Sequence, residues 1–228
     1  RGYIIGFYYT SADLAFYNRG EGIPGIINRN ISGTVSSVLF PVLTKLQDDK
    51  IAVKRALSRS MKTCSYLMMP LLFGLAAISD KLVVLLYTER WSQCVPFMQV
   101  ICVMELFNLL SMANLQALNA IGKADVVLKL EIYKKPPLVL ILIITAMISP
   151  LAICIGMLIY SLWAFIVNAF PNRKLISYPI KEQLKDVVEN VLLSFIMVIV
   201  VVLLGRLLPF SDMIIIAIQI TIGIATYI

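Results

Sequence analysis

Polar side chains recur along one face of the apolar stretch between Gln93 and Lys123. At about 100° per residue along a helix, five positions fall within about 80° of one another, and these are Glu105, Asn108, Met112, Gln116 and Asn119. A carboxylate or amide facing lipid hydrocarbon is unfavourable, so such a face turns toward other helices or a water-filled cavity. There a carboxylate binds a proton or cation, and amides hydrogen-bond polar substrates such as sugars.

Each polar residue of this stripe also has a purely structural interpretation. Amides inside a helical bundle often hydrogen-bond neighbouring helices, for about 1 kcal/mol each, and this is the first interpretation of Asn108, Gln116 and Asn119. Glu105 is a functional candidate by default, because it is ionisable and lies near the centre of the stretch. A carboxyl group that is protonated or paired is equally compatible with that position.

A membrane helix must hold the stripe. The roughly twenty residues 96–115 rise about 30 Å as a helix, which matches the hydrocarbon core of a bilayer. Of the whole chain, 60% is hydrophobic and 14% is charged, and the mean hydropathy is +0.88. These values exclude an ordinary soluble domain and indicate an all-α polytopic membrane protein.

The apolar pattern divides the chain into four parts. Residues 1–25 are predicted to be the end of a transmembrane helix followed by an outer loop from residue 10, and 26–170 the transmembrane helices of one lobe. Residues 171–186 form a basic cytoplasmic loop, and 187–228 a two-helix appendage. Seven crossings are expected, at residues 26–46, 63–79, 96–115, 138–149, 151–170, 187–208 and 213–228.

Local signals add detail to this division. In the first crossing, Asn28, Ser32 and Ser36 form a polar stripe, for which helix packing is the first interpretation. We expect residues 47–62 to form a separate surface helix and 80–92 to lie along the outer interface. The pair Pro136–Pro137 predicts a break or a fresh helix start.

The net charge of +7 comes from short basic runs between apolar segments. Residues 45–62, 123–135 and 173–185 carry six, four and four Lys or Arg, whereas three outer connections carry two, none and one. The positive-inside rule places the basic runs in the cytoplasm. The charge therefore indicates membrane topology, and no nucleic acid partner is predicted.

The residue inventory argues against an enzyme. The sequence has no histidine, the commonest general base and metal ligand. Its cysteines lack the spacing of a zinc site or a disulfide framework, and they are Cys64, Cys94, Cys102 and Cys154. We predict no catalytic residue, no metal site and no cofactor.

Five stretches carry a family resemblance, and they are ADLAFYNRGEGIPG, ISGTVSSVLFPVLTKLQDD, MKTCSYLMMPLLFGLAAISDKLVVLLYTERW, ANLQALNAIGKADVVLKLEIYKK and NAFPNRKL. The chain resembles the Wzx-type polysaccharide or O-antigen flippases, the lipopolysaccharide biosynthesis proteins of the multidrug/oligosaccharidyl-lipid/polysaccharide exporter superfamily. The resemblance covers most of residues 1–186 and implies a MATE-like helical bundle, here the second lobe plus two extra C-terminal helices. Because the chain begins at Arg1 and stops at Ile228 within apolar runs, we expect a C-terminal fragment.

The resemblance also implies a function and a location. Such a protein would flip undecaprenyl-diphosphate-linked oligosaccharide across the bacterial inner membrane for O-antigen, capsule or exopolysaccharide synthesis. Its partners would be that substrate, the membrane lipids and a missing N-terminal lobe of the same protein. The candidate cavity residues are Asn18, Arg19, Arg29, Glu105, Asn108, Gln116 and Asn119, with Arg19 or Arg29 as the diphosphate contact.

Two departures from the family pattern keep alternatives open. Glu105 stands where a neutral residue is expected, and Pro136–Pro137 where a continuous helix is expected. A cation-coupled multidrug exporter of the same fold would use Glu105 as its coupling carboxylate. An inactive membrane remnant is the third reading of the sequence.

Overall fold

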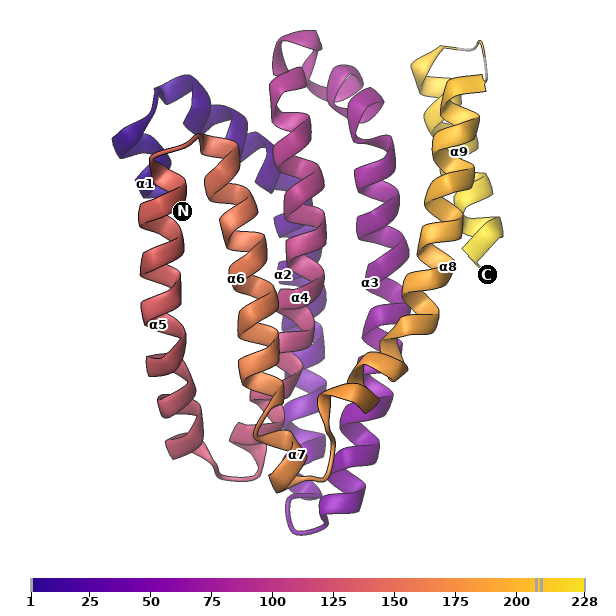
Figure 1. Ribbon diagram of the computed structural model, residues 1–228. Helices are drawn as coiled ribbons and strands as arrows, with labels where there is room; N and C mark the ends of the chain where they lie inside the picture. The colour runs from indigo at the N-terminus through magenta and orange to yellow at the C-terminus, as the bar shows by residue number, and fades with distance from the viewer. Residues whose placement is uncertain (1, 208, 210, 228) are drawn as a thin grey trace.

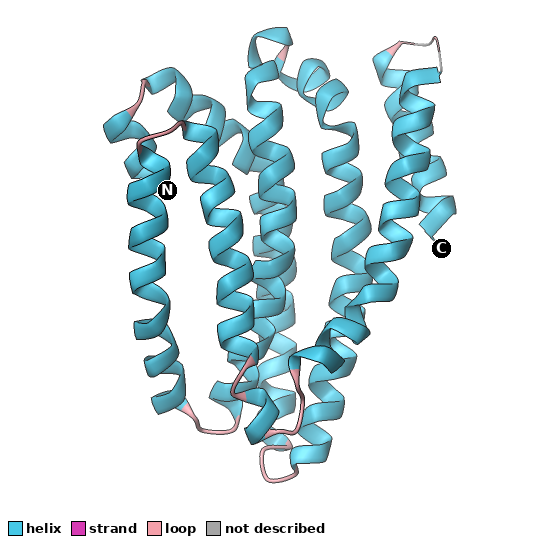
Figure 2. Ribbon diagram, in the orientation of Figure 1, coloured by secondary structure: helices cyan, strands magenta, loops and turns pink. Residues whose placement is uncertain are grey.

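The computed structural model describes residues 2–207, 209 and 211–227, and these fold into helices joined by short connections (Figures 1 and 2). The elements are α1 (Gly2–Tyr8), α2 (Ser11–Lys45), α3 (Lys50–Tyr87), η1 (Glu89–Cys94), α4 (Val95–Ala120), α5 (Ala124–Ala146), α6 (Pro150–Ala169), α7 (Asn172–Leu175), α8 (Ile180–Leu207) and α9 (Asp212–Tyr227). Arg1, Leu208, Phe210 and Ile228, which fall in the predicted segments 1–25 and 187–228, lie outside the described residues.

The helix that carries the polar stripe is the centre of the bundle. α4 packs against α2, α3 and α6, and it is the most buried of the helices long and apolar enough to span a membrane. Figure 1 shows α5 beside α6 at one edge, and α8 with α9 at the other. The stripe on α4 therefore has helices on several sides.

Within the described residues, four helices are long and apolar enough to cross a membrane: α3, η1 with α4, α6 with α7, and α8. This confirms the all-α polytopic class but not the expected seven crossings. α2 and α5 run alongside the others (Figure 1) but are too polar or charged to qualify, and α9 is an apolar helix of 16 residues.

The predicted outer loop after residue 10 is wrong, because α2 already begins at Ser11. Thr10 and Asp13 form a capping box that starts the helix. Gly20, within the residues expected to form that loop, has a packing role. A Cβ on Gly20 would lie 2.8 Å from the Phe97 Cβ and 2.9 Å from the Cys94 carbonyl oxygen, so this glycine lets α2 approach α4 closely.

Residues 50–87 form one helix, whereas separate surface, crossing and interfacial segments were expected. Asp49 caps its start by accepting from the backbone N–H groups of Ile51 and Ala52. The helix continues through Pro70 and ends before Thr88, whose φ of 75° is outside the helical region. At 38 residues, α3 rises about 57 Å and so exceeds the ~30 Å hydrocarbon core.

The predicted break at Pro136–Pro137 is also wrong, since α5 is continuous from Ala124 to Ala146. The two prolines remove the backbone donors that would reach the carbonyl groups of Ile132 and Tyr133. Both of these residues are largely exposed, and so is Pro136. The carbonyl groups that lose these donors therefore belong to exposed residues of α5, which allows the helix to continue.

Hydrogen bonds fix α8 to the basic end of α3. On α3, the Ser58 hydroxyl donates to the Asp186 carboxylate and Lys62 pairs with it at 3.2 Å. The Tyr178 hydroxyl, from the connection just before α8, donates to the same carboxylate at 2.6 Å. Burial raises the pKa of Tyr178, so the hydroxyl keeps the proton that it donates. One helical turn further on, Asn190 donates to the Ser65 hydroxyl at 2.6 Å. The appendage is thus attached by polar contacts as well as by apolar packing.

The close approach of α2 and α4 predicts opposite effects for two neighbouring glycines. Gly20→Ala should destabilise the protein by about 1–3 kcal/mol, because the new methyl group overpacks against Phe97 and the Cys94 carbonyl group. Gly22→Ala should be neutral or stabilise by up to about 1 kcal/mol, since nothing lies within 4 Å of its added Cβ. Unfolding of both variants in detergent, followed by circular dichroism, measures the difference. Equal stability of the two variants would contradict this packing.

Candidate functional site

The polar stripe of α4 meets α2 at Glu105. The Asn28 side-chain amide donates to Glu105 Oε2 at 2.5 Å, and the Asn108 amide donates to the same oxygen at 2.9 Å. The Glu105 side chain is buried, with 5% of the residue exposed. The carboxyl group is therefore held between two amides and turned away from lipid.

A second polar contact joins the same helices further along. The Ser36 hydroxyl donates to Met112 Sδ at 3.0 Å, and the Gln116 amide donates to the Ser36 oxygen at 3.2 Å. Asn119 lies beyond these contacts and is exposed. We call the residues joined in this way the polar seam, and they are Asn28, Ser36, Glu105, Asn108, Met112 and Gln116.

The seam arises because two sequence stripes face one another. Asn28 and Ser36 are two helical turns apart on α2, and Glu105, Asn108, Met112 and Gln116 share one face of α4. Sequence analysis treated the α2 stripe as packing and did not identify Asn28 as the partner of Glu105. The regular spacing of both stripes was the only sequence feature that pointed to this contact, but spacing does not show which helices become neighbours.

The side of α2 next to the seam is exposed and unusually polar for a helix that runs alongside membrane-spanning helices. Its exposed polar and small residues fall within about 140° of one another on the helical wheel. We call this surface the open face of α2, and its residues are Arg29, Asn30, Gly33, Thr34 and Ser37. The Thr34 and Ser37 hydroxyls donate to backbone carbonyl groups of their own helix, whereas the Arg29 charge has no such local partner.

The two candidate arginines have different surroundings. The Arg19 guanidinium lies 4.6 Å from the centre of the Tyr87 ring and 4.8 Å from that of Trp91, so cation–π contacts hold it against the end of α3 and η1. For Arg29, no ion pair or ring contact is present in the part of the chain that the structure describes. Arg29 is therefore the better placed of the two to bind an anion.

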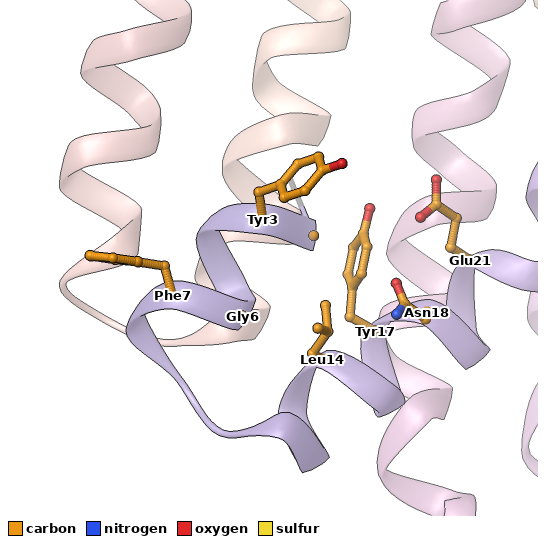
Figure 3. A pocket seen from close by; sticks show the side chains of 8 residues that line it. Tyr3, Gly6, Phe7, Leu14, Tyr17, Asn18 and Glu21 are labelled. Atoms are coloured by element: carbon orange, nitrogen blue, oxygen red, sulfur yellow. The ribbon is translucent and has the colours of Figure 1, made fainter.

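Asn18 belongs to a separate cavity of about 670 Å³ between α1 and the first turns of α2 (Figure 3). Figure 3 shows Tyr3, Tyr17 and Glu21 beside Asn18 around this cavity. Asn18 precedes Asn28 by ten residues, which is about 15 Å along α2. The predicted site residues consequently lie in several places: the cavity, the Arg19 stack, the open face, the seam, and Asn119 beyond it.

Among the described residues, no group of three or more His, Cys, Asp or Glu side chains is placed to hold a metal ion. The four cysteines are free thiols and buried.

Comparison with known proteins identifies relatives of this chain. Residues 1–96 match the family "Polysaccharide biosynthesis protein". The teichuronic acid biosynthesis protein TuaB of Bacillus subtilis is 25% identical over 197 residues, which are 85% of this chain and 39% of that protein. The lipopolysaccharide biosynthesis protein WzxC of Escherichia coli is 25% identical over 118 residues, 52% of this chain and 24% of that protein.

A solved structure matches the fold. The lipid II flippase MurJ, in an inward closed conformation, superimposes with a TM-score of 0.79 at 19% identity, over 98% of this chain and 47% of MurJ. The chain thus spans less than half the length of these proteins. The matched family and the curated relatives confirm the resemblance that the sequence motifs indicated: the chain is similar to polysaccharide biosynthesis proteins, among them TuaB and WzxC.

Proposed function

We propose that the chain is the second lobe of a transporter that flips lipid-linked oligosaccharide across the bacterial inner membrane, for the synthesis of a surface polysaccharide. The observation that carries the proposal is the open face of α2, where Arg29 lies exposed among polar and small residues. The named roles of the relatives in polysaccharide biosynthesis and the MurJ fold support it.

The chemistry of the open face suits such a substrate. A lipid diphosphate is an anion, and the planar guanidinium of Arg29 donates several hydrogen bonds to phosphate oxygens. The Asn30 amide lies beside Arg29 on the same exposed surface, and it offers both a donor and an acceptor to sugar hydroxyl groups. In this proposal the polyprenyl tail stays in lipid while the polar head passes along α2.

An opposing lobe completes the proposed cavity. The chain covers 47% of MurJ and smaller shares of its curated relatives, so a first lobe of similar size is the expected partner. That lobe would cover the open face of α2 and leave water between the two. Rocking of the lobes would then expose Arg29 to each side of the membrane in turn.

The multidrug exporter alternative depends on Glu105 as an ion-coupling group. Glu105 accepts hydrogen bonds from Asn28 and Asn108 within the seam, and it does not lie on the open face. This position favours the structural interpretation of Glu105, and no other observation favours a drug substrate.

Arg29 and Arg19 provide a matched pair of variants. In the complete protein, Arg29→Gln should reduce flipping at least tenfold, because it removes about 1.5–3 kcal/mol of charge-assisted hydrogen bonding to the diphosphate. Arg19→Gln should leave flipping within about twofold, since that guanidinium stacks on Tyr87 and Trp91. Surface polysaccharide made by a deletion strain that carries each variant gives the measurement.

Protein amount in the membrane, measured for both variants, is the control for this comparison. Unchanged polysaccharide with Arg29→Gln, or an equal loss with both variants at equal protein amounts, would count against the open face as the substrate surface.

Deletion of the complete gene tests the class of substrate. We expect lipid-linked oligosaccharide to accumulate in the cytoplasmic leaflet, with no change in sensitivity to toxic cations. Leaflet location can be read from protection against a glycan-modifying enzyme added outside inverted or right-side-out vesicles. Normal distribution of the glycan lipid together with raised drug sensitivity would replace the flippase with an exporter.

A further inference from the structure

A groove of about 760 Å³ runs between α2 and α3 near the connection that joins them. Apolar side chains of α2 form much of its wall, including Val35, Val38, Leu39 and Val42. From Thr34 to Leu46, the residue that directly follows α2, this wall covers thirteen residues, or about 18 Å at the helical rise, which is close to the length of an extended acyl chain.

Two arginines line the α3 side of this groove. Arg55 and Arg59 are exposed and one helical turn apart, so their guanidinium groups lie on one side of α3. In the part of the chain that the structure describes, the ion pairs of α3 involve Lys54, Lys62 and Lys81, and none involves Arg55 or Arg59. The groove therefore has a positive rim without acidic partners.

The lysines that flank the two arginines in the sequence, Lys54 and Lys62, show the contrast. Lys54 pairs with Glu182 at 2.6 Å and Lys62 with Asp186 at 3.2 Å, and both carboxylates belong to α8. The basic residues of α3 that face α8 are thus neutralised within the protein. Those that face the groove must find anions elsewhere.

The level of the arginines in the membrane indicates where the anions come from. α3 is much longer than the hydrocarbon core is thick, and its basic first turns precede the apolar part of the helix. Arg55 and Arg59 consequently lie at the depth of the lipid headgroups on the side that the positive-inside rule assigns to the cytoplasm. Below them, exposed Leu67 and Leu71 continue the apolar surface of α3.

We propose that this groove is a binding site for an anionic phospholipid of the cytoplasmic leaflet, with its phosphate at Arg55 and Arg59 and one acyl chain against the apolar wall of α2. Charge complementarity selects the headgroup, and the apolar wall selects a lipid over a free anion. The proposal concerns a resident lipid and does not depend on what the protein transports.

Lipid retention by the detergent-purified protein tests this site. Native mass spectrometry would count bound phosphatidylglycerol and phosphatidylcholine for the unaltered chain, for Arg55→Gln/Arg59→Gln, and for the control Lys54→Gln/Lys62→Gln, which removes the same charge from the α8 side. We expect the arginine variant to lose the preference for phosphatidylglycerol by about tenfold or more. The lysine variant should keep the preference, and phosphatidylcholine binding should be equal in all three proteins.

Helix content measured by circular dichroism checks that each variant is folded. If the double arginine variant is not folded, the single variants Arg55→Gln and Arg59→Gln replace it in the experiment. Equal losses in the arginine and lysine variants would show a net-charge effect and overturn the site, as would an unchanged preference. Displacement of phosphatidylglycerol by inorganic phosphate alone would overturn the part assigned to the acyl chain.

Discussion

The structure depends on one constraint, which is that a carboxyl group inside a membrane bundle needs hydrogen-bond partners. Glu105 finds them in Asn28 of α2 and Asn108 of its own helix. Loss of either donor or acceptor in such a buried set costs about 1–3 kcal/mol. This requirement fixes the rotation of α4 about its axis and brings its stripe against α2. Once Asn28 and Ser36 are used for the seam, Arg29 and its neighbours are left on the adjacent, exposed side of α2.

Much of this arrangement could be predicted from the spacing of residues. The face of α4 that carries Glu105 and Gln116 follows from a helical period, and so does the stripe that carries Asn28 and Ser36. The spacing does not show that the stripe of α2 contacts the stripe of α4. The pairing of helices that are distant in sequence depends on the packing of the whole bundle. The different surroundings of Arg19 and Arg29 follow from that pairing, since Tyr87 and Trp91 reach Arg19 only in the folded chain.

The errors in the sequence analysis have a common cause. The region of Gly20 was expected to be a loop and Pro136–Pro137 a break, yet Gly20 allows close packing and Pro136 lies within a continuous helix. In a bundle, neighbouring side chains and open surfaces accommodate these residues, so local propensity is a weaker guide than in an isolated helix. The sequence analysis also expected residues 47–62 to form a helix separate from the crossing at 63–79. No residue between these two segments ends the helix, so α3 runs through both.

Asn28 and Ser36 pair α2 with α4, and in the proposed transporter the adjacent open face of α2 lines a water-filled cavity. Single cysteines on the open face, at Gly33 and Ser37, compared with cysteines at the buried positions Leu39 and Leu43, test this arrangement most directly in native membranes. The four natural cysteines are buried, so they should give a low background with a charged, membrane-impermeant thiol reagent. The account predicts rapid labelling at positions 33 and 37 and little at 39 and 43. Equally slow labelling at all four positions would contradict it, because lipid or protein would then cover the open face.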